Sequence, residues 1–235
     1  MPIPNVYQNQ GEGVIASYDY TDIAEGTGLV KFVAWRRYAD SPSDVFKLNK
    51  SAPFYVALSE CIETADSTSS DFANVMERTF SAAPFNLPKV IGGTCIVEIP
   101  FIMTATVSND AGEVRATATL KNGSKSETIA TAVYDRTQTN LGLDGLGANV
   151  VRMLHVIISV PNYHFKKGEY LQLFINVSTR RTSGAGTVRA SVAYDPLNRD
   201  MPPVGGSDPD PDITPSTDTG ITSVLSAYIP FRIDL

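Results

Sequence analysis

Alternation of apolar and polar residues along one stretch constrains the fold more than any other feature of the sequence. In "YLQLFINVSTR", residues 170–180, an apolar residue occupies every second position: Leu171, Leu173, Ile175 and Val177. Side chains two residues apart lie on the same face of a β-strand, so the pattern predicts a strand with one buried face.

Similar stretches recur along the chain, and residues that favour turns separate them. "NDAG" (109–112), "KNGS" (121–124) and "SGAG" (183–186) contain the Gly, Asn and Asp that tight turns prefer. We therefore expect a hairpin between a strand at 94–108 and a strand at 113–120, extended to a meander by 127–135. Further strands are expected at 29–35, 53–59, 149–160 and 187–195.

Three local features refine this prediction. Pro100 interrupts 94–108 and predicts a bulge or an edge position there, because proline cannot donate to a sheet. The 149–160 strand is too apolar for an exposed strand, and we expect Pro161 to end it. Residues 69–83 have apolar side chains at helical spacing behind a possible N-cap, Asp71, and predict one short helix.

The predicted fold class is all-β: a jelly-roll-like antiparallel β-sandwich with one short helix and extended N- and C-terminal arms. An immunoglobulin-like sandwich is the main structural alternative. That fold places a tryptophan between two core cysteines, whereas Trp35 precedes both Cys61 and Cys95 here.

The chain divides by composition into four parts. An N-terminal arm (1–17) precedes the sandwich (18–200), a Pro/Asp-rich linker (201–220) follows, and an apolar segment (221–235) ends the sequence. This docking strand could return to its own sheet or add to the sheet of a neighbouring subunit. Its candidate assembly contacts are Ile221, Val224, Leu225, Tyr228, Ile229, Phe231, Ile233 and Leu235.

Net charge and cysteine usage exclude several classes of partner. The formal net charge of −6 argues against binding to nucleic acid or to an anionic membrane surface. We expect no signal peptide and no membrane span, because the required apolar runs are missing. Two distant cysteines in apolar segments predict core thiols in a protein made in a reducing cytoplasm.

Residues that would carry catalysis are few and poorly grouped. His155 lies in an apolar strand and is expected to be a hydrogen-bonded core or interface residue, and His164 is expected to pack at a strand–turn junction. Glu60, Glu63 and Glu98 are candidates for a carboxylate pair, but 25 acidic residues make chance pairs frequent. We therefore expect no catalytic residue, no cofactor and no metal.

Two acidic stretches are also not interpreted as binding sites. "DPDPD" (208–212) has carboxylates but an extended, proline-rich backbone, so we interpret it as a solvated linker and not as a calcium site. Asp19, Asp22 and Glu25 precede Gly26 and Gly28 but lack the Lys-Ser/Thr ending of a phosphate loop. They are expected to mark the solvated entrance to the first strand.

Three stretches resemble segments of one group of known proteins. They are "DYTDIAEGTGLVKF" (19–32), "YHFKKGEYLQLFINV" (163–177) and "TVRASVAYDPLNRD" (187–200). Together they look like segments of tailed-bacteriophage virion structural proteins with jelly-roll folds, such as capsid decoration or cement proteins. The resemblance covers roughly residues 18–200, and the linker with its apolar tail departs from it.

This resemblance implies assembly and no chemistry. The expected function is a non-enzymatic virion structural protein that stabilises a capsid lattice, made in the host cytoplasm and located in the virion. Its expected partners are the major capsid protein or other virion proteins, and further copies of itself, with a homotrimer favoured. A carbohydrate- or receptor-binding β-sandwich module of a virion or tail is the alternative. An esterase or glycosidase comes third, because it would need a carboxylate pair or a triad that the sequence does not assemble. The fold alone does not rank the three, because β-sandwiches host all of them.

Overall fold

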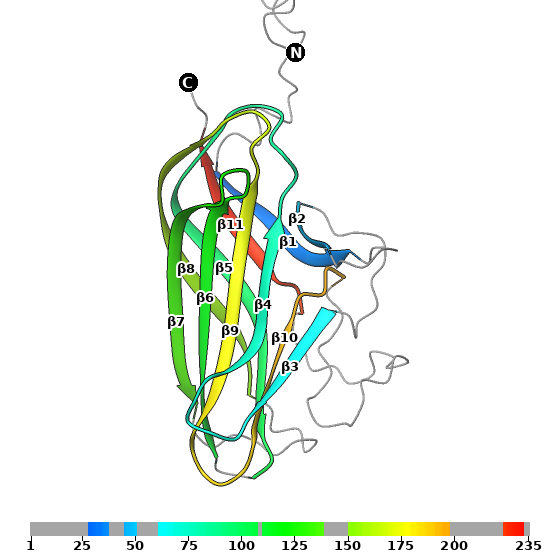
Figure 1. Cartoon of the computed structure of the whole chain (residues 1–235), viewed down its shortest axis with the longest axis vertical. Coiled ribbons are helices and arrows are strands. Elements are labelled where there is room, and N and C mark those ends of the chain that lie inside the picture. The colour runs from blue at the N-terminus through cyan, green and yellow to red at the C-terminus, as the bar shows by residue number, and fades with distance from the viewer. Residues whose placement is uncertain are drawn as a thin grey trace, which may run out of the picture.

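The computed structural model describes residues 28–37, 45–50, 61–107, 110–138, 150–197 and 223–232. The regular elements in these ranges are β-strands, which confirms the all-β prediction. They are β1 (Gly28–Arg37), β2 (Val45–Asn49), β3 (Ile62–Ser67), β4 (Ala73–Ser81), β5 (Lys89–Ala105), β6 (Ala111–Asn122), β7 (Glu127–Gln138), β8 (Val150–Phe165), β9 (Leu171–Ser183), β10 (Val188–Ala193) and β11 (Ser226–Arg232) (Figure 1).

All these strands belong to one sheet that folds over itself into two layers. Its order is β3-β10-β5-β11-β1-β2-β4-β9-β6-β7, with β8 paired to β5 off this path. One layer contains β8, β5, β11 and β1, and the other contains β4, β9, β6 and β7 (Figure 1). β2 joins the layers, because it pairs with β1 and makes a parallel bridge to β4 at Lys47 and Ser81.

The core lies between the two layers and is built by alternate residues. The four apolar residues predicted to share one face of β9 are all fully buried, so that strand and its buried face are confirmed. Burying an aliphatic side chain of this size stabilises a fold by about 1.5–3 kcal/mol. Cys61 and Cys95 form no disulfide and are buried in the same core, so both are core thiols as predicted. Burial raises the pKa of the Cys95 thiol to about 12, so the thiol stays protonated at neutral pH.

The predicted hairpin between 94–108 and 113–120 is wrong, although both strands exist. β5 pairs with β8, β10 and β11, whereas β6 lies in the other layer and pairs with β7 and β9. The connection after β5 therefore crosses between layers, and the expected three-stranded meander reduces to the β6–β7 hairpin. A turn sequence specifies that the chain reverses and not which strand it then pairs with.

The predicted helix at 69–83 is also wrong, because residues 73–81 form β4. Its ladder with β9 has a register shift between Asn74 and Met76. This bulge allows consecutive residues, Val75 and Met76, both to be buried. Buried side chains at Val75, Met76 and Phe80 then have the spacing of a helix within a strand.

The two prolines do not act as the sequence indicated: the bulge lies at Pro161 and not at Pro100, and neither proline ends its strand. At Pro100 no register shift occurs; there β5 changes its partner from β11, last paired at Glu98, to β10, first paired at Phe101. Pro161 does not end β8 but lies with Asn162 in a bulge, opposite the single residue Gly92. A side chain at Gly92 would collide with the side-chain oxygen of Asn162.

Several predicted segments lie outside the described residues. These are the N-terminal arm (1–17), the strand at 53–59, the acidic stretch before Gly28 and the linker (201–220). The arm and the linker stay predictions. Gly28 has a φ of 101°, which suits glycine at the turn into β1, as the sequence indicates.

Candidate functional site: the outer faces of the sandwich

The C-terminal segment contributes a central strand to its own sheet. β11 pairs with β1 on one edge and with β5 on the other. Of the predicted assembly contacts, Leu225, Ile229 and Phe231 are buried in the core, and Val224 and Tyr228 are half-buried. Ile221, Ile233 and Leu235 lie outside the described residues. The contribution of these residues to assembly stays a prediction.

The outward side chains of β1, β11, β5 and β8 form a surface that we call the apolar face. Cross-strand pairing places Lys31, Tyr228, Ile96 and Ile157 in one row across the four strands. Leu29, paired with Pro230, lies beside that row on β1 and β11. Leu29 is 57% exposed and Ile157 is 63% exposed, values typical of charged surface residues and high for large aliphatic side chains.

Polar groups flank the first row on both sides. On one side Thr94 of β5 pairs with Ser159 of β8, and both are exposed; on the other side lies a second row. Val33, Ser226, Glu98 and His155 follow one another across the strands. Nε2 of His155 lies 3.7 Å from Oε1 of Glu98, and Nζ of Lys31 lies 5.6 Å from the centre of the Tyr228 ring. These contacts leave the aliphatic side chains of the first row accessible to a partner.

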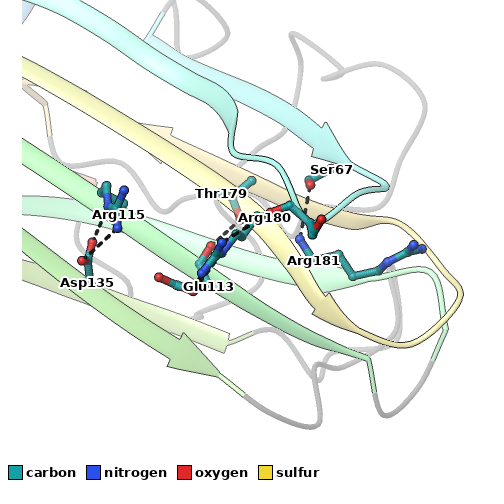
Figure 2. Close-up of polar contacts among 8 residues, drawn as sticks. Ser67, Glu113, Arg115, Asp135, Thr179, Arg180 and Arg181 are labelled. Atoms are coloured by element: carbon teal, nitrogen blue, oxygen red, sulfur yellow. Dashed lines mark hydrogen bonds and ion pairs between the residues drawn. The ribbon is translucent and has the colours of Figure 1, made fainter.

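The outward side chains of β4, β9, β6 and β7 form the opposite surface, the polar face. One of its rows contains Glu77, Asn176, Thr117 and Val133. Towards one end of the face two ion pairs bridge neighbouring strands (Figure 2). In one, Arg115 donates from Nε to Oδ1 of Asp135 at 2.8 Å, and in the other Nη2 of Arg180 donates to Oε2 of Glu113 at 2.7 Å.

Aromatic rings on and beside the polar face are covered by cations of the same chain. The guanidinium groups of Arg115 and Arg180 lie 4.5 and 4.6 Å from the centre of the Phe72 ring. Nζ of Lys121 lies 4.8 Å from the centre of the Phe174 ring. These rings already contribute cation–π interactions, so the polar face consists of paired charges, hydroxyls and engaged aromatic rings.

The predicted catalytic candidates do not come together. His155 and His164 are both exposed. The core alternative for His155 is therefore wrong, because on β8 it points outward between the buried Leu154 and Val156, and the interface alternative stays a prediction. Glu98 contacts His155 on the apolar face. Glu63 instead contacts Arg78 at 2.8 Å and accepts a hydrogen bond from Tyr194, while Glu60 lies outside the described residues.

Polar groups buried at the end of the sandwich hold a turn in place. Nδ2 of Asn122 donates to Oε2 of Glu169 at 2.9 Å and to the hydroxyl of Tyr163 at 3.0 Å. Glu169 also accepts from the backbone N–H of Lys166 and pairs with Nζ of Lys125 at 3.0 Å. The backbone N–H and the ammonium group lower the pKa of Glu169, because they stabilise its carboxylate.

The described ranges hold no cluster of three or more His, Cys, Asp or Glu residues that could bind a metal ion. They also hold no helix long and apolar enough to cross a membrane.

The sequence matches no family model and no curated protein. Solved structures with a distant likeness include an alpha-amino acid ester hydrolase, at a TM-score of 0.43 and 12% identity over 79% of this chain. An aminopeptidase from a marine sediment Thaumarchaeota archaeon has a TM-score of 0.42 and 7% identity over 85% of this chain. The VP2 subviral particle of infectious bursal disease virus has a TM-score of 0.28 and 11% identity over 85%.

This chain spans 34% and 36% of the two hydrolytic enzymes and 46% of the capsid protein. The neighbours therefore include hydrolases and viral capsid proteins, at TM-scores below 0.5. At that level the comparison does not choose between the two functions.

The sequence did not identify most of the apolar face. In "HVIISV", residues 155–160, Val156, Ile157 and Ile158 are all apolar, so alternation cannot tell which of them points outward. The distinguishing feature is the register with β5, which sets Ile157 opposite Ile96 and both outside the core.

Proposed function

We propose that this protein is a non-enzymatic virion structural protein of the capsid decoration or cement type, and that it binds a capsid lattice through its apolar face. The observation that carries the proposal is the exposure of Leu29 and Ile157 on a sheet face that also presents Ile96, Tyr228 and Pro230. Exposed apolar residues grouped on one face typically mark a surface that another protein covers.

The structure changes how the C-terminal strand would serve this function. The inward side chains of β11 pack in the core of the same chain, so its outward residues, Tyr228 and Pro230, are the ones we assign to the lattice contact. The proposed partner is the major capsid protein or another virion protein. A homotrimer remains the favoured oligomer, on the resemblance and the two terminal arms.

A carbohydrate- or receptor-binding module is the second candidate. Phe174 and Phe72 lie among Thr, Asn and charged side chains at the polar face, a composition that glycan-binding surfaces use. Lys121, Arg115 and Arg180 already lie over these rings, which leaves less open aromatic surface for a sugar to stack on. For this reason the glycan function ranks below assembly.

Co-expression with the major capsid protein from the same genome tests the proposal. After separation on a sucrose gradient, the protein is expected in the capsid fractions, and light scattering of the free protein is expected to give the mass of a trimer. A protein that stays at the top of the gradient while capsids form normally would contradict the lattice function, and a strict monomer at high concentration would contradict the trimer.

A further inference from the structure

A cleft of about 310 Å³ opens at one end of the sandwich, away from the centres of both outer faces. It is lined by β1, β2, β11 and the segment between β4 and β5. Its volume falls at the lower end of the range of pockets that hold small ligands, which are mostly apolar with a few polar groups.

Aromatic rings form the apolar part of the cleft. Phe32 and Phe231 are buried and lie 6.1 Å apart between ring centres. Phe85 meets Phe231 edge-on at 6.0 Å and rests on Phe165 at 5.1 Å. Phe85 is half-buried, while Phe32, Phe231 and Leu48 line the cleft as buried residues, and this apolar lining suits a phenyl ring or a short alkyl chain.

The backbone fixes the wall that carries Phe85, although residues 82–88 are not part of a strand. The backbone N–H of Phe85 donates to the carbonyl of Glu169 at 2.9 Å, and the backbone N–H of Gly168 donates to the carbonyl of Phe85 at 2.8 Å. Glu169, next to Gly168, is held by a buried hydrogen bond from Asn122 and by an ion pair with the partly exposed Lys125. A wall supported in this way is formed before a ligand arrives, which lowers the cost of binding.

The rim of the cleft is basic in a chain that is acidic overall. Lys50 and Lys89 both line it, beside the amides of Asn49 and Asn86. Both lysines also interact within the protein, so a ligand would add to their contacts. Two ammonium groups at one apolar opening favour an anionic ligand over a neutral one, although the chain as a whole has a net charge of −6.

We propose that this cleft binds a small amphiphilic carboxylate, with its phenyl or alkyl group against Phe32, Phe85 and Phe231 and its carboxylate at Lys50 and Lys89. This inference does not depend on the proposed virion function. It gives the chain a small-molecule site separate from the apolar face.

A titration with 4-phenylbutyrate, followed by NMR of the backbone amides, tests the proposal. Binding is expected to shift the amides of residues 82–89 and to saturate, and 4-phenyl-1-butanol, which lacks the charge, is expected to bind at least about tenfold more weakly. The double variant Lys50→Met/Lys89→Met is expected to lose that preference for the carboxylate. Lys121→Met, which removes a lysine from the polar face, is the matched control and is expected to bind as the wild type does.

A substitution that fills the cleft gives an independent check. Ala83 is exposed and lines the opening, so Ala83→Trp is expected to abolish binding without changing the core. Three results would overturn the proposal: no saturable shifts at residues 82–89, equal affinity for the acid and the alcohol, or unchanged binding by a folded Ala83→Trp variant. Each leaves the capsid measurement unaffected, so the two proposals fail separately.

Discussion

The two outer faces of the sandwich share one core but differ in what they present to solvent. Across the polar face, Arg115 pairs with Asp135 and Arg180 pairs with Glu113, so its charges are satisfied within the chain. Across the apolar face, Leu29 and Ile157 are exposed in or beside a row that contains Ile96 and Tyr228, and polar residues flank this row. A solvated sheet face ordinarily presents polar side chains outward, and the polar face follows that rule more closely than the apolar face does, with Val133 as its exposed aliphatic residue.

This difference distinguishes the inward residues, which stabilise the fold, from the outward residues, which face solvent. The inward side chains of both layers pack in one core and account for the fold, so the outward side chains are free to differ. Paired surface charges contribute little to stability, and exposed aliphatic groups contribute less still. The exposed aliphatic residues of the apolar face are the ones that we propose a partner covers.

The largest expected effect comes from changing an inward residue of β11. Ile229→Ala removes a fully buried side chain from a strand paired on both edges and is expected to lower the free energy of unfolding by about 2–5 kcal/mol. The neighbouring Tyr228→Ala changes an outward residue and is expected to cost about 1 kcal/mol or less. Urea denaturation measures both, and equal losses would show that the two sides of β11 are not distinct.

A smaller effect is expected on the polar face. Arg180→Met removes the pair with Glu113 and the contact with Phe72, and is expected to lower the free energy of unfolding by about 1 kcal/mol or less. The difference from wild type should shrink further in 1 M salt, because a partly exposed ion pair is screened. A loss above about 2 kcal/mol, unchanged by salt, would mean that this face is structural and not a solvated surface.

Sequence alone predicts the elements of this fold better than their partners. The buried face of β9 is predicted correctly from Leu171, Leu173, Ile175 and Val177, because apolar residues occupy every second position along this part of the strand. In β4 a bulge breaks that period, and the resulting spacing imitates a helix. The layer crossing after β5 is missed because pairing between distant strands is decided by the packing of the whole core and leaves no local sequence pattern.

The candidate surfaces, like the strand pairing, depend on contacts between residues that are far apart in the sequence. The C-terminal strand is recognised from its composition, yet its central place between β1 and β5 depends on contacts with residues far away in the sequence. To predict the apolar face from the sequence, one must know which residues of an all-apolar run point outward. The aromatic cleft assembles Phe32, Phe85 and Phe231, which are 53 or more residues apart.

Two exposed β-branched residues allow a matched test of the two faces. Ile157 on β8 is 63% exposed, and Val133 on β7 is 56% exposed. In the described part of the sheet β8 pairs with β5 alone and β7 pairs with β6 alone. Both side chains point into solvent from such a strand, so a charge at either position should leave the core intact. The two positions differ in the face on which they lie.

The most direct measurement is the fraction of each variant that co-sediments with capsids, for Ile157→Glu and Val133→Glu beside the wild type. A carboxylate at residue 157 would have to be desolvated in the proposed contact, so Ile157→Glu is expected to reduce binding at least about tenfold, and Val133→Glu is expected to bind as the wild type does. Circular dichroism confirms that both variants are folded. Normal co-sedimentation of folded Ile157→Glu, or a selective loss in Val133→Glu, would contradict the assignment of assembly to the apolar face.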